Sequence, residues 1–444
     1  MADTLAADDT IAAIASATGA GGVGVIRVSG PRAIEVVAAT LGRQTLPERE
    51  VVVGRARDAG GARIDQVIAF AMRAPRSFTG EDVAELHGHG GAANLAALLD
   101  AVLSRGARLA APGEFTRRAF TSGKLDLTQV EALPLVIEAG SERALRVAQA
   151  QLDGALGAHL AELHGRALAV LAELEATIDF PEEELGPSGP AWIAAELTAL
   201  ATACEQLARS FRAGRALGGG LVVALVGPVN AGKSSLVNAL LGQERVLVAA
   251  TPGTTRDVVE ARAIWDGVPV TLVDTAGERA DPAGLDDVER RGIALGRERA
   301  TAADVVVVVN DDEAGWDDGA RFGDRAVVVH SKADLRSTRV GALPTSATTG
   351  VGLDQLRAEV LRRAGLADAE GAVDQVLVTA RQHELVGRAA AAALAALAGL
   401  AAARPAELVA IDARDVVTAL AALLGREVDE ALLDTIFARF CLGK

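Results

Sequence analysis

The stretch LVVALVGPVNAGKSSLVNAL, residues 221–240, decides the fold of the middle of the chain. Its apolar beginning predicts a buried strand, and its end predicts a helix. Between them, Gly227, Gly232, Lys233 and Ser234 form the pattern G-x-x-x-x-G-K-S. In this strand–loop–helix setting the glycines let backbone N–H groups surround phosphates, Lys233 reaches the outer phosphates, and Ser234 binds Mg²⁺. A glycine-rich turn that arose by chance is the weaker alternative, because it would not be expected between a strand and a helix.

Further motifs follow in the order expected of one nucleotide site. Thr254 and Thr255, in TPGTTRD, are candidates to close over the terminal phosphate and Mg²⁺. Asp274 opens DTAG after an apolar run and is placed as a Walker-B-type carboxylate and phosphate sensor. Asp334, in SKAD, can accept both N–H groups of a guanine edge, and Ser346-Ala347 is placed as the final base contact.

The five motifs in this order resemble the GTPase superfamily, and the match is specific. Ser331 is a departure, because the base-reading motif usually begins with Asn or Thr. Lys332 and Asp334 are kept, so a preference for guanine is expected, with lower affinity as a possible consequence. The resemblance implies GTP contacts from Asn230, Ala231, Gly232, Lys233, Ser234, Ser235, Ala249, Ala250, Thr251, Pro252, Gly253, Thr254, Thr255, Asp274, Thr275, Ala276, Gly277, Ser331, Lys332, Ala333, Asp334, Ser346 and Ala347.

The hydrolytic machinery is less clear from the sequence. Glu278 follows DTAG, where Ras-type GTPases place a water-orienting Gln. Arg256 is explained as well by a surface position as by an arginine finger. Asn230, within the phosphate loop, could instead help to hold a monovalent cation that neutralises charge beside the β- and γ-phosphates. Stabilisation of the loop is the other explanation for Asn230.

Composition limits the class of protein. The 444 residues suffice for two or three domains, and half of them are apolar. Cys204 and Cys441 give neither a disulfide framework nor a zinc spacing, which fits a reducing cytoplasm. The apolar run Ala389–Ala403 is too short for a bilayer, which takes roughly 20 residues, so we expect a packed helix and no membrane. A net charge of −15 argues against non-specific nucleic-acid binding, although a local basic site or a basic partner could still bring in RNA.

The composition and hydrophobic periodicity of successive segments predict a multidomain chain of α+β and α/β class. Residues 1–120 mix strand-like runs with a helix at Ala92–Ser104 and form an N-terminal α+β domain. Long Ala/Leu/Glu/Arg helices fill 121–216 and return at 368–444, whereas apolar strands alternate with helices over 217–367. We therefore expect an α-helical bundle domain in two parts, with a Ras-like P-loop GTPase domain inserted between them as a parallel sheet with flanking helices. Three independent domains in series are the weaker alternative. The strands predicted for the inserted domain are Leu221–Val226, Val270–Val273, Val305–Val309 and Ala326–His330.

Outside the five motifs the resemblance narrows to one family. VNAGKSS and PGTTRD are similar to the cation-dependent, dimerising GTPases of the TrmE–Era–EngA type. DTIAAIASATGAGGVGVIRVSGP near the beginning, RSFTGEDVAELHGHGG, APGEFTRRAFTSGKLDLTQVEA and IDFPEEE further on, and FCLGK at the end resemble the MnmE (TrmE) family of tRNA modification GTPases. These segments are long and specific, and the resemblance covers nearly the whole chain.

This resemblance implies a first domain that binds a reduced folate, a tetrahydrofolate derivative, as one-carbon donor and that also forms a homodimer. The positions that match the family's folate contacts are Arg27, Glu85, Lys124 and the terminal Lys444. A carboxylate such as Glu85 can pair with the amide and amidine edge of a pterin, and the cations can meet the anionic folate tail. Without the resemblance, these four residues would count as ordinary surface charges.

The resemblance also implies a reaction. With an FAD-containing partner of the MnmG type, in a heterotetramer, the family adds a carboxymethylaminomethyl or aminomethyl group to C5 of the wobble uridine of certain tRNAs. GTP and K⁺ bring the G domains together across the homodimer, and GTP hydrolysis gates the modification. The implied metal ligands are Ser234 and Thr255 for Mg²⁺ and Asn230, Ala249, Thr251 and Thr254 for K⁺.

Several assignments remain open at this level. In the family, the water-positioning carboxylate lies in a segment like D-x-V-E-R-x-G-I, which favours Glu289, with Glu278 as the alternative. Cys441 is either a catalytic thiol near the one-carbon donor or a helix-end residue packed beside aromatic rings. His87 and His89, in HGHG, are predicted to be turn residues and not metal ligands.

The alternative function is a regulatory or ribosome-assembly GTPase without folate chemistry, which the terminal segments argue against. A P-loop scaffold without turnover is a third and weaker class, because Lys233, Ser234 and Asp274 are intact.

Overall fold

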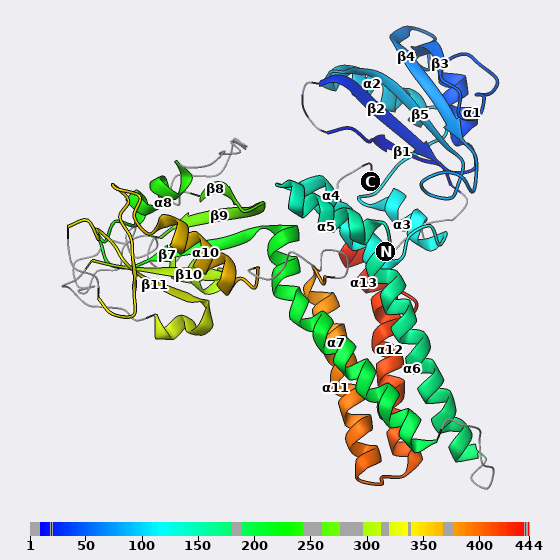
Figure 1. The fold of residues 1–444 in the computed structure, drawn as a ribbon. Coiled ribbons are helices and arrows are strands. Elements are labelled where there is room, and N and C mark those ends of the chain that lie inside the picture. The colour runs from blue at the N-terminus through cyan, green and yellow to red at the C-terminus, as the bar shows by residue number, and fades with distance from the viewer. Residues whose placement is uncertain are drawn as a thin grey trace. The chain divides into compact units, whose positions relative to one another are not determined.

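The computed structural model describes residues 9–17, 19, 21–179, 189–242, 260–275, 296–311, 319–335, 339–366, 376–438, 440 and 443. The chain forms two compact units. The first contains residues 1–131 and 425–444, and the second contains residues 132–424. Figure 1 labels most of their helices and strands.

The first unit is built on a six-stranded sheet with the strand order β3-β4-β5-β2-β1-β6. Its neighbouring strands are antiparallel, except for β1 and β6, which are parallel. Helices α1 and α2 pack on one face over a core that includes Ile26, Val67 and Leu86. Because strand side chains alternate between faces, the residues between these core positions point to the opposite face. The elements are β1 (Ile11–Ile14), β2 (Gly21–Ser29), α1 (Ala33–Thr40), β3 (Val52–Arg57), β4 (Arg63–Met72), β5 (Val83–Gly90), α2 (Ala92–Leu103), β6 (Arg108–Leu109), α3 (Glu114–Thr121) and α13 (Glu430–Phe437).

The chain passes from the first unit to the second within α4 (Leu127–Glu138). The helical part of the second unit has a core that includes Leu160, Leu200, Val386 and Leu420, contributed by segments far apart in sequence. Helix α11 packs against α7 and α12, and α12 packs against α6. The helices are α5 (Glu142–Leu152), α6 (Ala155–Asp179), α7 (Pro190–Gly219), α11 (Ala380–Ala401) and α12 (Ala406–Leu424).

Helix α11 contains most of the apolar run that was predicted to be a packed helix. By length and composition alone it could cross a membrane. Its Val386, Ala393 and Ala396 side chains are nevertheless fully buried in the core of the helical bundle. A capping box of Thr379 and Gln382 fixes its first turn. The position of α11 within the bundle agrees with the predicted packed helix.

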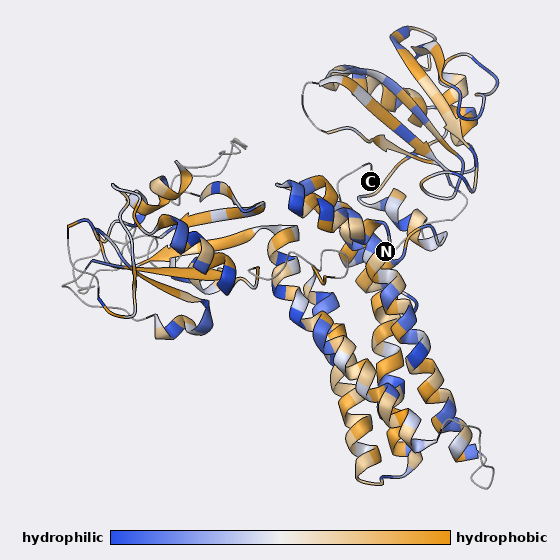
Figure 2. Ribbon diagram, viewed as in Figure 1, coloured by the Kyte–Doolittle hydropathy of each residue, from blue (hydrophilic) through white to orange (hydrophobic). Residues whose placement is uncertain are grey.

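The remainder of the second unit is an α/β domain around a sheet with the order β12-β11-β10-β7-β9-β8. Its strands are parallel, apart from β8, which runs antiparallel to β9. The apolar strands appear as continuous hydrophobic ribbons in Figure 2, as expected for a sheet covered on both faces. The elements are β7 (Leu221–Val226), α8 (Lys233–Leu241), β8 (Glu260–Trp265), β9 (Val268–Asp274), β10 (Val305–Asn310), η2 (Ala320–Arg325), β11 (Ala326–His330), β12 (Leu343–Pro344) and α10 (Leu353–Arg363).

Helix α7 leads through the single residue Gly220 into β7, so the helical bundle and the α/β domain are joined by a very short connection. Close to this connection, a Cβ atom on Gly214 would lie 2.2 Å from the carbonyl oxygen of Leu377. Only glycine therefore lets α7 approach the segment that enters α11. The predicted fold class, an α+β domain, a helical domain and an inserted P-loop domain, is confirmed.

Candidate functional site

The phosphate loop lies between the end of β7 and the beginning of α8. Gly227 has φ +148°, and a Cβ atom there would lie 2.1 Å from the carbonyl oxygen of Val309. Gly232, at the N-terminus of α8, has φ +89°, and Asn230 has φ 67°. Both glycine positions are unfavourable for any other residue. The backbone therefore takes a path that only this glycine spacing allows, and it ends at a helix N-terminus that favours anions.

Lys233 forms hydrogen bonds within the phosphate loop, and Ser234 forms one to a carboxylate beside it. Lys233 is buried, and its Nζ atom donates hydrogen bonds to Pro228 O at 2.9 Å and Gly227 O at 3.1 Å. The Ser234 hydroxyl donates to Asp274 Oδ2 at 2.5 Å. The other oxygen of Asp274, Oδ1, is buried and has no hydrogen-bond partner within the described parts of the chain. A hydroxyl and a carboxylate oxygen beside the phosphate loop are the hard donors that Mg²⁺ prefers, so these residues fit that ion.

The base-reading motif lies directly against the phosphate loop. The Ser331 hydroxyl is 2.7 Å from Ala231 O and 3.0 Å from Asn310 O. Lys332 Nζ donates to Asn230 O at 3.0 Å and forms an ion pair with Asp311. Two segments separated by about a hundred residues are thereby fastened together, and Ser331 makes the contact to the loop in place of the usual Asn or Thr.

Backbone hydrogen bonds place the remaining residues of the predicted base site next to the SKAD segment. Ala333 N donates to Thr345 O at 3.0 Å, which brings the SKAD segment beside Ser346. Ser346 is buried, and its hydroxyl accepts a hydrogen bond from Thr349 N at 3.2 Å. Asp334 is exposed and has no side-chain partner among the residues that the structure describes. Its carboxylate is therefore available for a base edge.

Part of the predicted site lies outside the described residues. This holds for the carboxylates Glu278 and Glu289, for Cys441 and Lys444, and for the segment after α8 and the end of DTAG. The predicted GTP and metal contacts concerned are Ala249, Ala250, Thr251, Pro252, Gly253, Thr254, Thr255, Ala276 and Gly277.

Asp311 was not singled out from the sequence. It follows Asn310 directly after β10, and its carboxylate pairs with Lys332 of the base-reading motif. The signal that could have found it is its position, because polar residues just after a buried parallel strand lie at the edge of the sheet where ligands bind.

In the first unit, Arg27 and Glu85 form a direct pair. They lie opposite each other in the register of β2 and β5, and Arg27 Nε is 2.9 Å from Glu85 Oε1. The Glu85 residue is only 7% exposed, and the Arg27 guanidinium lies within 6 Å of the rings of Phe78 and Phe115. A carboxylate buried to this extent needs such partners, because desolvation otherwise penalises its charge.

The second oxygen of Glu85 meets His87. His87 Nε2 lies 2.8 Å from Glu85 Oε2, and the imidazole packs against Phe70 with ring centroids 5.3 Å apart. The prediction that His87 and His89 are turn residues is therefore wrong, because both lie in strand β5. The Gly-rich pattern was interpreted as a turn, although alternation along a strand explains why His87 shares a face with Glu85.

The other predicted folate contact in the described chain, Lys124, is placed differently. Its Nζ donates a hydrogen bond to Pro75 O at 3.0 Å, and no contact joins it to Arg27 or Glu85 within the residues that the structure describes. The structure thus brings together two of the four predicted folate residues.

A second acidic centre lies on the neighbouring strand. Asp65 accepts hydrogen bonds from the backbone N–H and ring Nδ1 of His89, each at 2.8 Å, and from Asn94 Nδ2 at 2.7 Å. Burial raises the pKa of Asp65, but these hydrogen bonds and one from the Gln66 N–H outweigh it and lower the pKa to about 2. The group is thus a fixed anion that orients His89 at the end of β5.

Cys204 lies in the core of the helical bundle and is fully buried. Burial raises the pKa of its thiol to about 11, so the thiol stays protonated at neutral pH. It therefore has a packing role and is not a nucleophile.

The phosphate loop around Lys233 and the base-reading motif around Asp334 together define the class of protein. A phosphate loop, a carboxylate beside its Ser and a base-reading Lys and Asp fastened to the loop are the parts of a P-loop GTPase domain.

Comparison with known proteins defines the family. A model described as the MnmE helical domain matches residues 127–441, and one described as the GTP-binding protein TrmE N-terminus matches residues 10–124. The tRNA modification GTPase MnmE of Synechococcus sp. (strain CC9605) is 42% identical over 98% of this chain and 99% of its own length. That of Symbiobacterium thermophilum is also 42% identical, over 98% of this chain and 100% of its own length. The chain belongs to the MnmE (TrmE) family.

Among solved structures, the G domain of the T. maritima FeoB iron transporter is 24% identical, with a TM-score of 0.26. The likeness covers 32% of this chain and 98% of that one. The family assignment rests on the sequence relatives.

Proposed function

We propose that the chain hydrolyses GTP in order to drive addition of a carboxymethylaminomethyl group to C5 of the wobble uridine of certain tRNAs. Family membership establishes the coarser statement, that the chain is a GTPase of tRNA modification. The observation that carries the GTP-binding part of the proposal is the set of hydrogen bonds from Ser331 and Lys332 that join the base-reading segment to the phosphate loop. It supports a site that holds the base and the phosphates of one nucleotide at the same time.

For the chemistry of hydrolysis, we propose that Ser234 and Thr255 hold Mg²⁺ beside the phosphates. Bound there, the ion would neutralise charge that develops on the phosphate oxygens. Lys233 contributes a second positive charge, and its hydrogen bonds to Gly227 O and Pro228 O support this role because they hold it within the loop. Asp274 Oδ1, which has no hydrogen-bond partner among the described residues, supports an ion at this place.

We further propose that K⁺, held by Asn230, Ala249, Thr251 and Thr254, brings the G domains of a homodimer together. Glu289 is proposed to position the attacking water, in preference to Glu278. The test is K⁺-stimulated GTP turnover of Glu289→Ala and Glu278→Ala. Normal turnover in the first and loss in the second would reverse the assignment. Equal turnover in Na⁺ and K⁺ would remove the role of the cation.

The first unit is proposed to bind a reduced folate through Arg27, Glu85, Lys124 and Lys444. The buried Arg27–Glu85 pair supports this, because a carboxylate fixed between two partners is oriented before a pterin edge arrives. A titration with a reduced folate tests the proposal. Absence of binding would favour a regulatory GTPase without folate chemistry.

The chain is proposed to act in the cytoplasm as a homodimer that joins an FAD protein of the MnmG type in a heterotetramer. Cys441 is retained as a candidate thiol, and intact tRNA modification by Cys441→Ser would leave it only a packing role. The decisive experiment for the whole function is mass analysis of wobble uridines from cells that lack the protein. Unchanged nucleosides would overturn the proposal.

A further inference from the structure

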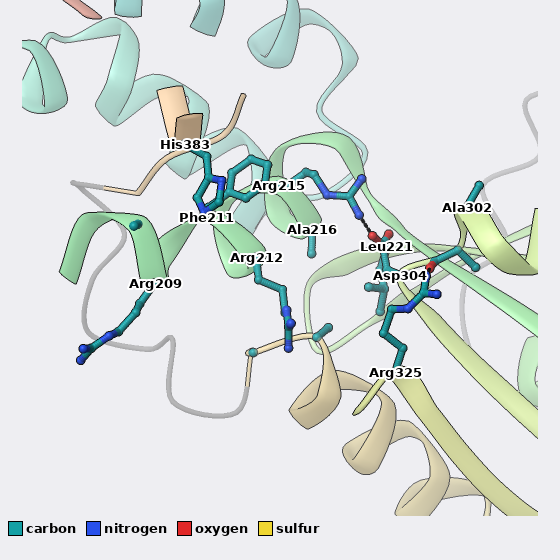
Figure 3. Close-up of a pocket in the computed structure, with 14 residues that line it drawn as sticks. Arg209, Phe211, Arg212, Arg215, Ala216, Leu221, Ala302, Asp304, Arg325 and His383 are labelled. Atoms are coloured by element: carbon teal, nitrogen blue, oxygen red, sulfur yellow. Dashed lines mark hydrogen bonds and ion pairs between the residues drawn. The ribbon is translucent and has the colours of Figure 1, made fainter. Parts of the chain in front are cut away.

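A cavity of about 650 Å³ lies where helix α7 meets the α/β domain in the second unit. Figure 3 shows its lining, in which arginine side chains from two different parts of the unit reach toward the same space. Arg212 and Arg215 lie in α7, and Arg325 is the residue just before β11. Arg209 extends away from the centre and forms the rim (Figure 3).

The cavity lies at a defined edge of the sheet. Leu221 begins β7, Asp304 directly precedes β10, and Arg325 directly precedes β11. These three strands are adjacent and parallel, so their amino ends share one edge. The phosphate loop follows the carboxyl end of β7 and lies at the opposite edge. A ligand in the cavity would therefore leave the nucleotide site free.

The cavity carries an excess of positive charge. Asp304 is the only carboxylate among the lining residues that the structure describes, which also include Arg209, Arg212, Arg215 and Arg325. Asp304 pairs with Arg215 and also accepts a hydrogen bond from Val222 N at 2.9 Å. This excess stands out in a chain whose net charge is −15.

The arginines also have donor capacity that the described chain does not use. Arg212 is exposed, and its one hydrogen bond within the described residues is a 3.5 Å contact to Arg363 O. Arg325 Nη1 donates to Thr301 O and Ala303 O, and no carboxylate pairs with it in the described residues. A guanidinium has five N–H donors in a planar fork that suits phosphate oxygens.

Beside the arginines lies an aromatic surface. Phe211 and His383 stack with ring centroids 4.5 Å apart and an interplanar angle of 21°, and both line the cavity. His383 is exposed, so one ring of the stack can meet a ligand. Cationic groups beside exposed aromatic rings are typical of surfaces that bind RNA.

We propose that this cavity binds backbone phosphates of an RNA substrate, with Arg212 and Arg325 as the main contacts. The proposal rests on the proposed function, because that function supplies the RNA. An acidic chain that contacts RNA directly needs a local region of positive potential, and the arginines that line this cavity supply one. The competing explanation is that Arg212 and Arg325 only satisfy carbonyl groups at helix ends. The exposure of Arg212, and the fact that the described residues give it only one long hydrogen bond, favour RNA.

The test is fluorescence anisotropy of the full chain with a fluorescein-labelled anticodon stem-loop over a series of salt concentrations. Arg212→Ala is expected to weaken binding about fivefold at 0.1 M salt and to lower the slope of log affinity against log salt by about one. Arg212→Lys should restore most of the slope, because it keeps the charge. The matched control is Arg414→Ala, which removes an exposed, Glu175-paired arginine elsewhere in the unit and should change neither quantity.

Equal affinity and slope for wild type and Arg212→Ala would overturn the proposal, as would equal losses in Arg212→Ala and Arg414→Ala. Failure of the wild type to bind the stem-loop at low salt would also overturn it. Calorimetric binding of inorganic phosphate that is lost in Arg212→Ala, together with no binding of the stem-loop, would assign the cavity to a free anion instead. GTP turnover of Arg212→Ala should equal that of the wild type, so loss of RNA binding is distinguished from failure of the GTPase.

Discussion

The nucleotide site and the Glu85 site of the first unit are assembled in opposite ways. The phosphate loop is made of consecutive residues, and its shape is set by Gly227 and Gly232 together with the helix that follows. The Glu85 site is made across strands, because Arg27, Glu85 and His87 meet only through the register of β2 with β5 and the alternation along β5.

This difference has a physical basis. A phosphate is bound largely by backbone N–H groups and a helix terminus, so the required features are short-range and leave a pattern in the sequence. A planar ligand edge is met by side chains, whose placement depends on which strands are neighbours. The two sites should therefore respond independently to substitution, and the predictions below examine that independence in order of decreasing effect.

The largest effect is expected for Lys233→Ala. Lys233 is buried within the phosphate loop and supplies positive charge where the reaction develops negative charge. We expect GTP turnover to fall by about a hundredfold or more, as for the loss of one stabilising charge in an active site. Phosphate release measures this, and affinity for a reduced folate should not change. A variant that turns GTP over at the normal rate would contradict the assignment of the loop.

These two regions also show how far sequence reasoning reaches. The strand Leu221–Val226, the phosphate loop and the helix after it were predicted, because strand, glycines and helix follow one another directly. The Arg27–Glu85 match came from family resemblance, whereas the link to His87 was missed because HGHG was interpreted as a turn.

The arginine cavity was beyond prediction for the same reason. Its charged residues come from the last turns of α7 and, much further along the chain, from Asp304 and Arg325 at the amino ends of β10 and β11. No local pattern connects Arg212 with Arg325. Their proximity follows from the order β11-β10-β7 in the sheet, which composition and periodicity do not specify.

The next effect concerns the stability of the first unit. Hydrogen bonds lower the pKa of Asp65 to about 2, so its anion stabilises the fold above the ordinary pKa near 4, and this stabilisation is lost as pH falls toward 2. Asp65→Asn should cost about 2 kcal/mol at pH 7 and about half as much at pH 3. Hydrogen exchange of amides in β4 and β5 measures the loss. The exposed Asp100→Asn is the control, and a cost independent of pH would contradict the role of the charge.

A smaller effect is expected at the Glu85 site. Glu85→Gln removes the charge that pairs with Arg27 and His87 and should weaken reduced-folate binding about tenfold. His87→Phe keeps a ring against Phe70 but leaves Glu85 Oε2 without that partner, so a severalfold loss is expected. Calorimetric titration measures both, and Glu35→Gln, in an exposed pair with Arg32, is the control. Lower GTP turnover of the purified chain in either variant would show that the two sites are not independent.

The smallest effect is expected for Ser331→Ala, which examines the one departure within the otherwise local nucleotide site. The hydroxyl is buried between Ala231 O and Asn310 O, so its loss removes about one hydrogen bond between the base-reading segment and the phosphate loop. At about 1 kcal/mol for that bond, affinity for GDP should fall about fivefold. Titration of a fluorescent GDP analogue measures this, and competition with ATP reports whether guanine is still preferred. Preference should persist, because Lys332 and the exposed Asp334 carboxylate are unchanged. Unchanged GDP affinity would mean that Lys332 alone joins the base-reading segment to the phosphate loop. The Ser331 hydroxyl would then contribute nothing measurable to nucleotide binding.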